Sequence, residues 1–406
     1  MNSPLTERIE TAGPATEIDV WENLPAEQQP TWRGHPGWSA ATTRLAGEQP
    51  LVTLSEAEAL RARLSRVEAG REQLLQIGDC AENFGECTAP HMAEKLATLD
   101  SLSDALRQRT ALDVVRVGRF GGQFAKPRSS DTEWHEGVEL PVFRGHLVNS
   151  ETPTAAARHH DPRRMVWAYE ASAKTMEWLR QHRHRRDSLV PDGPWSSHEA
   201  LVMDYESNLV RTDSATGVRY LGSTHLPWIG ERTRQPDAAQ VRLLAAVANP
   251  IGCKIGPSAT PADVVRLCEV LDPDRLPGRL TMICRMGRDA VEQTLPPVVD
   301  AVNESGHRVV WLVDPMHGNT TKTADGVKTR YLDDISTEAL AAKAVLRTHG
   351  SHPAGLHLEV AADEVTECVG GPIEGEQDLY RHYTTLCDPR LNPEQAHLLL
   401  EQWASC

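Results

Sequence analysis

Short apolar runs recur along the chain, and most of them are followed by glycine, charged or ligand-type residues. Continuous apolar runs of this length are typical of strands that are buried on both faces of a parallel sheet. We expect such strands at 74–77, 114–117, 219–222, 251–255, 280–284, 309–313, 355–358 and 383–387. After 309–313 the chain reads DPMHGN, which predicts a strand that delivers polar groups at its C-terminal end.

Helical patterns fill the intervals between these runs. The first helix is expected over 54–70, with Ser55 as its N-cap and Gly70 at its end. Further helices are expected at 89–108, 161–182, 261–271, 289–305, 335–348 and 392–403. Strands that alternate with helices in this way predict an α/β fold of the (β/α)8 TIM-barrel type. A doubly wound sheet is the alternative, but no G-x-G-x-x-G sequence follows any of the expected strands.

Two parts of the chain do not fit the simple alternation. Residues 1–50 are rich in Pro, Glu, Gln and Thr. We expect 1–70 to form an N-terminal arm and helix that pack on the barrel or on a partner subunit, with the catalytic barrel over 71–406. The interval 129–216 after the second strand is too long for one loop and predicts a helical insertion. Its basic stretch 180–194 is expected to be a surface loop.

Composition narrows the class of protein. A formal net charge of −15 disfavours a nucleic-acid partner bound through its phosphates, although local arginines can still bind a small anion. The 8 cysteines are scattered without a C-x-x-C pair, as expected in a reducing compartment. The polar N-terminus does not resemble a signal peptide, and no run approaches the ~18 apolar residues of a membrane span. We therefore expect a cytoplasmic enzyme.

Four potential metal ligands follow separate expected strands: Cys80, His317, Glu359 and Asp388. A thiolate, an imidazole and two carboxylates suit a borderline divalent metal such as Mn²⁺, Co²⁺, Fe²⁺ or Zn²⁺. Each residue alone has a simpler role, as a buried thiol, a hydrogen-bonded loop histidine or a helix cap. Their shared position at the ends of strands favours a dispersed catalytic site over a closed structural zinc site.

A second set of residues at the strand ends is cationic. It comprises Arg119, Lys126, Arg128, Arg232, Arg234, Lys254 and Arg285. Guanidinium groups match phosphate and carboxylate groups in geometry, so their convergence predicts a small polyanionic substrate. One or two of them could instead pair with nearby acids, and Arg234, close to Asp237, is the first candidate. Trp228 could be a pocket wall or part of the core.

These segments resemble the type II (plant-like) 3-deoxy-D-arabino-heptulosonate 7-phosphate (DAHP) synthases. The resemblance covers 55–403 and rests above all on GDCAE (78–82), GRFGGQFAKPRS (118–129), WIGERTRQ (228–235), NPIGCKIGP (249–257), DPMHGNT (314–320), GLHLE (355–359) and CDPRLN (387–392). It implies a metal-dependent, aldol-like condensation of phosphoenolpyruvate with D-erythrose 4-phosphate, the first step of the shikimate pathway. Mn²⁺ or Co²⁺ is the expected metal.

The resemblance also implies roles for individual residues. Cys80, His317, Glu359 and Asp388 would hold the metal, with Asp314 as a supporting acid. Phosphoenolpyruvate would be bound by Arg119, Lys126, Glu231 (through its backbone), Arg232, Lys254 and Arg285, all of which except Arg119 form the expected catalytic set. Trp228 would also contact substrate, and Arg128 with Ser129 would receive the sugar phosphate. The group that activates the attacking water stays open among Glu199, Glu231 and a metal-bound water.

Three departures from the family pattern bear on function. His146 stands where the family usually has the acid of RGD, the segment VAADEVTEC (360–368) lacks a usual Thr-Gly pair, and the chain is short around 180–197. The compact form most resembles members that serve phenazine and other secondary pathways, which predicts little inhibition by tryptophan and phenylalanine. Cys387, next to Asp388, predicts a reversible disulfide with Cys80 that would remove a metal ligand.

Other functions and partners are open at this point. An amino-DAHP synthase of an aminoshikimate route is the nearest alternative, and His146 alone hints at it. A non-catalytic homologue that binds a metal or a partner enzyme, such as a chorismate mutase, fits poorly with complete sets of ligands and cations. A metal-dependent hydrolase would need a histidine pair at a strand end, and His159 and His160 do not follow a strand. The N-terminal arm is compatible with a homo-oligomer.

Overall fold

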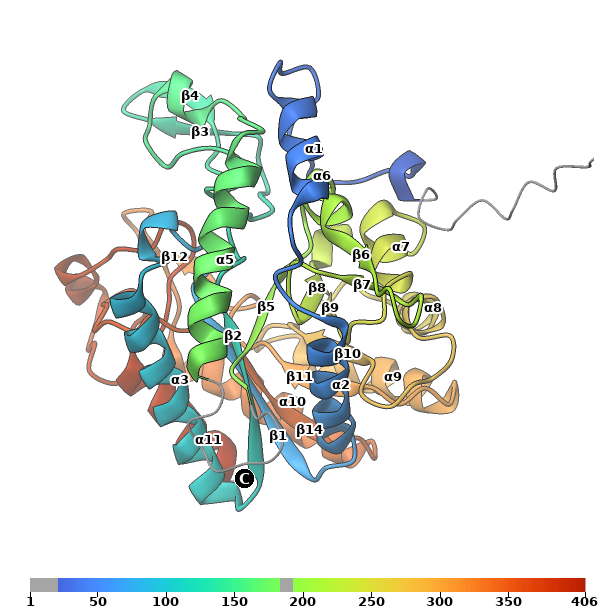
Figure 1. The fold of residues 1–406 in the computed structure, drawn as a ribbon. Coiled ribbons are helices and arrows are strands. Elements are labelled where there is room, and N and C mark those ends of the chain that lie inside the picture. The colour runs from blue at the N-terminus through green and yellow to red at the C-terminus, as the bar shows by residue number, and fades with distance from the viewer. Residues whose placement is uncertain (1–20, 183–192, 406) are drawn as a thin grey trace, which may run out of the picture.

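The computed structural model describes residues 21–182 and 193–405. Eight strands close into a barrel in the order β1-β14-β11-β10-β9-β8-β5-β2 (Figure 1), and all of their pairings are parallel. The strands are β1 (Glu72–Gly78), β2 (Asp113–Arg119), β5 (Trp195–Glu199), β8 (Leu226–Ile229), β9 (Ile251–Ile255), β10 (Leu280–Cys284), β11 (Val310–Val313) and β14 (Pro353–Glu359). The expected (β/α)8 barrel is confirmed.

Two of the expected strands are wrong as barrel strands. The run at 219–222 forms β7 (Arg219–Leu221), which pairs antiparallel with β6 (Val210–Thr212) in a hairpin outside the barrel. The run at 383–387 forms no strand and lies in the loop that carries Asp388. Their places in the barrel are taken by β5 and β8.

The polar sequence of β5, WSSHE, is the reason why an apolar pattern does not reveal it. All of its residues are buried, and its hydroxyl groups find partners inside the protein. Ser196 Oγ hydrogen-bonds with His225 Nδ1 at 2.7 Å, and Ser197 Oγ accepts from Gln76 Nε2 at 2.6 Å. Strand β8 reads LPWI, and its proline also disfavours a central strand. In β5, side-chain hydrogen bonds make burial possible where the other strands rely on apolar residues.

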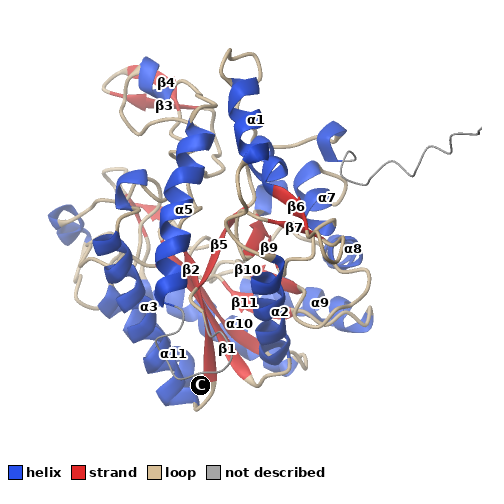
Figure 2. Ribbon diagram, in the orientation of Figure 1, coloured by secondary structure: helices blue, strands red, loops and turns tan. Residues whose placement is uncertain are grey.

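Helices surround the barrel, as Figure 2 shows. They are α3 (Ala89–Thr110), α5 (Arg164–His182), α7 (Ala239–Ala245), α8 (Pro261–Leu271), α9 (Val291–Glu304), α10 (Leu332–Thr348) and α11 (Pro393–Ser405). Each helix expected from 89–108 onward exists, with its ends shifted by at most a few residues. One apolar layer lies between strands and helices, and a second, which includes Leu74, Val115 and Leu312, fills the barrel. None of the described helices is long and apolar enough to cross a membrane.

Helix α2 (Leu54–Glu68) closes the N-terminal end of the barrel. Leu60 and Leu64 of this helix belong to the same apolar cluster as the residues that fill the barrel. Thr53, and not the expected Ser55, caps the helix, because Thr53 and Glu56 form a reciprocal capping box. Because α2 covers this end, the cavity of the barrel can open only at the C-terminal ends of the strands.

The remaining N-terminal segment packs against the short helix α6 (Met203–Glu206). Helix α1 (Trp38–Gly47) follows the short η2 (Trp21–Asn23). The indole N–H groups of Trp32 and Trp38 both donate to Asp204 Oδ2, at 2.8 and 2.9 Å. Residues 1–20 of the expected arm lie outside the described residues. The division of the chain at residue 70 stays a proposal.

An insertion separates β2 from β5, as expected. It contains the hairpin of β3 (Thr132–His135) and β4 (Val138–Pro141), the short α4 (Ala155–Arg158) and the long α5, and the hairpin stands at the top of Figure 1. Most of the basic stretch 180–194 lies outside the described residues, which exclude 183–192. The other short elements are η3 (Phe84–Glu86), α6 (Met203–Glu206), η4 (Ser207–Leu209), η5 (Glu231–Thr233), β12 (Thr321–Lys322), β13 (Lys328–Thr329) and η6 (Glu376–Arg381).

Candidate active site

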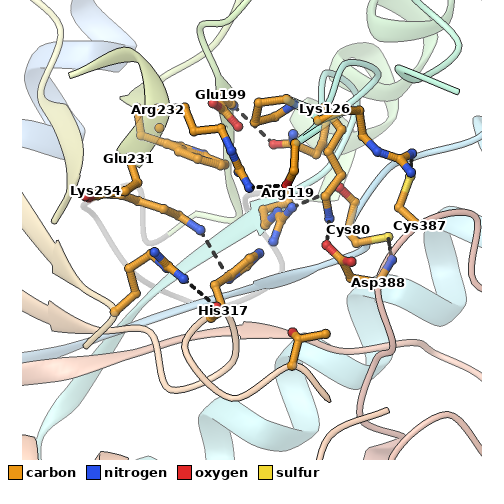
Figure 3. Close-up of a pocket in the computed structure, with 18 of the residues that line it drawn as sticks. Cys80, Arg119, Lys126, Glu199, Glu231, Arg232, Lys254, His317, Cys387 and Asp388 are labelled. Carbon is orange, nitrogen blue, oxygen red and sulfur yellow. Dashed lines mark hydrogen bonds and ion pairs between the residues drawn. The ribbon is translucent and has the colours of Figure 1, made fainter. Parts of the chain in front are cut away.

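A cavity of about 200 Å³ lies at the C-terminal ends of the barrel strands (Figure 3). Barrel enzymes keep their chemistry at this end, where the loops that follow the strands converge. The predicted site residues that line it are Cys80, Arg119, Lys126, Arg128, Ser129, Trp228, Glu231, Arg232, Lys254, Arg285, His317 and Asp388. Glu359 is fully buried at the end of β14 and contacts His317. The structure thus brings together every residue that we expected at the metal and the substrates.

Three of the predicted metal ligands form a compact group. Donor atoms of His317, Glu359 and Asp388 lie within 4.8 Å of one another, and His317 Nε2 is 3.0 Å from Glu359 Oε1. Cys80 lies at the edge of this group, where its Sγ accepts the backbone N–H of Asp388 at 3.3 Å. An imidazole, two carboxylates and an adjacent thiol are donors that suit a borderline divalent cation. The residues therefore fit a metal ion.

Asp314 orients the imidazole of His317. Its Oδ2 lies 2.8 Å from His317 Nδ1, which leaves Nε2 facing Glu359. Lys254 Nζ donates to the same Oδ2 at 2.8 Å. Although burial raises the pKa of Asp314, His317 and Lys254 hold that pKa well below its ordinary value. Asp314 also forms a second possible ligand group with His317 and His357, and His357 was not singled out from the sequence.

The carboxylates of the ligand group are already paired with cations. Arg330 Nη1 lies 2.7 Å from Glu359 Oε2, and Lys328 Nζ lies 2.9 Å from Asp388 Oδ1. Lys126 forms ion pairs with both carboxylates. Burial raises the pKa of Glu359, but His317 and Lys126 outweigh burial and hold that pKa well below its ordinary value. Sequence reasoning assigned no role to Lys328 or Arg330, because no expected strand ends next to them.

A buried ion-pair network joins the loops that carry Cys80 and Asp388. Arg390, two residues after Asp388, donates to Asp79 and to Glu367 Oε1, the latter at 2.8 Å. Lys95 of α3 contacts the other oxygen of Asp79 at 2.7 Å. The network holds Cys80 and Asp388 together although they lie far apart in the sequence. Its members were not identified from the sequence, although Asp79 and Arg390 lie beside predicted ligands.

Cys80 and Cys387 share a side-chain hydrogen bond. Burial raises the pKa of Cys80, but this bond and the charge of Lys126 lower the pKa to about 6. The same contact and burial raise the pKa of Cys387. The two thiols are therefore neighbours, as the expected disulfide requires. Reversible oxidation itself stays a prediction.

Trp228 forms a wall of the cavity and is only 2% exposed. Lys254 Nζ lies 4.5 Å from the centroid of its ring, and the guanidinium of Arg119 lies 5.7 Å from it. Cations stack favourably on an indole face, so the ring holds both side chains in place. Both roles left open from the sequence apply, because Trp228 lines the cavity and also belongs to the apolar cluster that fills the barrel.

The cations at the mouth of the cavity come from the loops after β2, β8 and β10. Arg232 Nη2 donates to Ser129 Oγ at 2.9 Å, which joins two of these loops. Arg128 Nη1 donates to the carbonyl of Phe143 at 2.6 Å. Arg285 donates to the carbonyl of His317, so it reaches the ligand group through the backbone.

Arg234 is the member of the cationic set that does not line the cavity. Its Nη2 contacts Glu231 Oε1 at 3.1 Å. The expected neutralisation by an acid therefore occurs, but the partner is not Asp237, which pairs with Arg242 and Arg266. Arg234 holds the side chain of Glu231 at the edge of the cavity.

The carboxylate of Glu82 fixes the backbone of the loop that follows β2. Glu82 accepts the backbone N–H groups of Gly121, Gly122 and Gln123, each at 2.9 Å. A Cβ on Gly122 would lie 2.1 Å from His198 Nδ1, so the loop can pack this closely only with glycine there. This packing positions Lys126 further along the loop.

His146 does not line the cavity. Its ring packs edge-on against Phe84 and Phe143, and its Nε2 lies 2.7 Å from Glu151. Its Nδ1 accepts the backbone N–H of Phe84 at 3.3 Å. In the described structure this departure from the family pattern therefore contacts two aromatic rings and Glu151 outside the cavity.

A closed parallel barrel with a charged cavity at its mouth defines a TIM-barrel enzyme. The profile of the Class-II DAHP synthetase family matches residues 16–186 and 181–401. The chain belongs to this family, and the expected enzyme class is confirmed.

Curated relatives agree over nearly the full chain. The chain is 45% identical to a probable phospho-2-dehydro-3-deoxyheptonate aldolase of Pseudomonas fluorescens, with 94% of this chain and 95% of the relative covered. It is 42% identical to the phospho-2-dehydro-3-deoxyheptonate aldolase of Streptomyces coelicolor, with 93% and 94% covered. A solved structure of a Francisella tularensis enzyme with this name has a TM-score of 0.54 at 12% identity and covers 90% of this chain and 95% of its own, which supports the fold alone.

Proposed function

We propose that this chain is a metal-dependent DAHP synthase. It would condense phosphoenolpyruvate with D-erythrose 4-phosphate to give DAHP and phosphate, the first step of the shikimate pathway and of aromatic biosynthesis. The observation that carries the proposal is one cavity in which an acidic and imidazole ligand group adjoins a ring of cations. Relatives at 42–45% identity bear the name of this activity, which supports the assignment.

The cations suit a substrate that carries both a phosphate and a carboxylate. Arg119 and Lys254 lie against the face of Trp228, and Arg285 and Arg232 flank them around the cavity. In a cavity of about 200 Å³, these groups would hold phosphoenolpyruvate in one orientation. The backbone of Glu231, at the start of η5, would complete the phosphate site.

The residues that would hold the metal are Cys80, His317, Glu359 and Asp388. When bound, a divalent ion supplies Lewis acidity to the aldehyde oxygen of the sugar. Mn²⁺ or Co²⁺ is the proposed ion, with Fe²⁺ and Zn²⁺ as alternatives. Lys126 and Arg330, which pair with the carboxylates in this structure, keep both acids ionised and in place.

The sugar phosphate would bind at Arg128 and Ser129, where the loop after β2 meets Arg232. The phosphate of the sugar and that of phosphoenolpyruvate would then be bound by neighbouring cations, which places the aldehyde near C3 of the enol. C3 attacks the aldehyde carbon, water adds at C2, and phosphate leaves.

The deciding experiment measures consumption of phosphoenolpyruvate with erythrose 4-phosphate as co-substrate. We expect turnover that chelation abolishes and Mn²⁺ or Co²⁺ restores. Turnover that survives exhaustive chelation would refute metal dependence, and no DAHP under any metal would refute the activity.

The pathway served and the regulation are finer parts of the proposal. The compact chain supports a role in phenazine or other secondary metabolism with weak or absent feedback inhibition. The N-terminal arm supports a homo-oligomer. A chorismate mutase partner is the least supported part. Initial-rate assays with micromolar tryptophan plus phenylalanine test the feedback, and strong inhibition would refute it. The amino-sugar alternative loses its support, because His146 lies outside the cavity.

A further inference from the structure

Glu199 is a buried acid on the side of the cavity away from the metal ligands. It ends β5, is 6% exposed and lines the cavity. In the barrel order β5 lies opposite β11, the strand that leads to His317, and Figure 3 shows Glu199 across the cavity from His317. Any substrate held by the cations between them has the metal site on one side and Glu199 on the other.

One oxygen of this carboxyl group has no partner within the described protein. Glu199 Oε1 is buried and accepts no hydrogen bond. A buried carboxyl oxygen without a hydrogen-bond partner is unfavourable, so a bound ligand or water is the expected partner. The backbone of Glu199 is fixed independently, because its N–H donates to Gln123 Oε1 at 3.1 Å.

Gly230 makes room for the carboxyl group. A Cβ at this position would lie 2.0 Å from Glu199 Oε1, closer than any real contact. The φ of Gly230 is −75°, which any residue can adopt, so the glycine is needed for space and not for its backbone conformation. The loop that carries Glu231 and Arg232 is therefore built around the Glu199 carboxyl group.

The surroundings of Glu199 allow it to exchange a proton near neutral pH. Burial raises its pKa to about 7, against the opposing charges of Lys254, Lys126 and Arg119. These cations are the ones expected to bind phosphoenolpyruvate. The acid is thus close to the reacting carbons.

We propose that Glu199 is the catalytic base that takes a proton from the water as it adds to C2 of phosphoenolpyruvate. This inference rests on the proposed function and assigns the group that the sequence left open. In this step the water oxygen bonds to C2, the C2=C3 electron pair forms the bond to the aldehyde carbon, and the aldehyde π pair moves to its oxygen. The water proton passes to Glu199.

The protons balance over the whole reaction. Water supplies two of them: one ends on the new hydroxyl group of the sugar, and the other ends on the released phosphate. Glu199 releases the first to solvent, and the new alkoxide on the metal side takes up a proton from solvent in its place. When C2–O cleavage expels phosphate, the C2 hydroxyl proton goes to the departing group, and Glu199 is ionised again for the next cycle.

Glu231 is a weaker candidate for this role. Its Oε1 is shared by Arg234 Nη2 and Ser258 Oγ, each at 3.1 Å. Its Oε2 has no partner in the described protein, as for Glu199 Oε1, but the ion pair with Arg234 holds this carboxylate and opposes its acting as a free base. Its proposed contribution is the backbone at the start of η5, which would complete the phosphate site.

Glu199→Gln tests the proposal with the metal-loaded enzyme. We expect kcat to fall by about 10²–10⁴-fold, while the affinity for phosphoenolpyruvate, measured by calorimetry, changes by less than about 3-fold. In the wild type, kcat/KM should fall as pH drops through about 7, because the base becomes protonated, and Glu199→Gln should lack this limb.

Two further variants separate the role of the carboxyl group from general effects of charge and burial. Gly230→Ala should reproduce the loss of kcat by displacing the carboxyl group without changing any charge. Glu338→Gln is the matched control, since Glu338 is a buried acid outside the cavity whose burial also raises its pKa to about 7, and it should keep the pH limb.

The outcomes separate the two proposals. A Glu199→Gln enzyme that keeps more than about a third of wild-type kcat, or that keeps the limb near pH 7, overturns the assignment and leaves the synthase activity standing. A wild-type enzyme that makes no DAHP overturns the proposed function and the assignment with it.

Discussion

The acidic side chains on the two sides of the cavity lie in opposite electrostatic surroundings. On the side of β1, β14 and β11, Glu359 and Asp388 are paired with cations. Burial raises the pKa of both carboxyl groups, but His317 and Lys126 at Glu359 and Lys126 at Asp388 hold each pKa below its ordinary value. On the side of β5, Glu199 lies near cations but keeps an unpartnered oxygen, and burial raises its pKa. Ion pairing keeps an acid ready to bind a cation, whereas burial without pairing leaves an acid able to exchange protons.

Lys254 connects the two sides. It lies over Trp228 on the substrate side, and its Nζ contacts Asp314, which orients His317. The anion and the metal would therefore be bound by groups that share one hydrogen-bond chain. Substitutions on either side should separate the two functions only when they leave this chain intact.

The largest effect is expected from His317→Ala. Loss of the only imidazole in the group with Glu359 and Asp388 should lower metal-dependent kcat/KM by about 10³-fold or more, since a Lewis acid contributes several kcal/mol. Metal content after dialysis, measured by mass spectrometry, should fall together with activity. Near-normal activity and metal content would remove His317 from the ligand set.

Arg232→Ala should affect the substrate side alone. Loss of a charge-assisted hydrogen bond to phosphate costs about 1.5–3 kcal/mol, so kcat/KM should fall by roughly 10–150-fold with no change in metal content. Arg266→Ala is the control, because it removes the same charge from an exposed pair with Asp237. Equal losses in both variants would mean that net charge, and not the contact at Ser129, causes the effect.

The sequence located the residues at the mouth of the barrel more completely than the individual strands beneath them. His317 and Lys254 follow apolar strands that are easily recognised, so their convergence follows from the parallel fold. Strand β5 was not predicted because its serines are buried through hydrogen bonds with Gln76 and His225. Such hydrogen bonds between distant residues give no periodic pattern in the sequence.

The supporting residues were missed for a similar reason. Arg330 and Arg390 lie in irregular loops, and their acidic partners Glu359 and Glu367 are 29 and 23 residues away in the sequence. Their importance becomes visible only when the loops are placed side by side. A Glu in a polar strand, such as Glu199, likewise gives no sign of burial until the strand is known to be in the barrel.

Arg390→Met should weaken the metal side without touching a ligand. The guanidinium ties Asp79 to Glu367, so its loss should let the loops of Cys80 and Asp388 separate. We expect metal affinity to fall by about 10–100-fold, as for other residues that support ligands. Titration with Mn²⁺ followed by electron paramagnetic resonance measures this directly. Unchanged affinity with a lowered melting temperature would show that the network serves folding alone.

The smallest effect on activity is expected from His146→Gln, which lies on neither side of the cavity. Values of kcat/KM for the sugar phosphate should change by less than about 3-fold, whereas loss of the Glu151 contact should cost about 1–2 kcal/mol of stability.

Burial lowers the pKa of His146 below its unfolded value of ~6.5, so the unfolded chain binds the proton more readily. Stability should therefore decline as pH falls below about 6.5, and the variant should lose that part of the decline in melting curves at pH 7.5 and 5.5. A change of tenfold or more in preference between erythrose 4-phosphate and its amino analogue would instead give His146 a role in substrate choice.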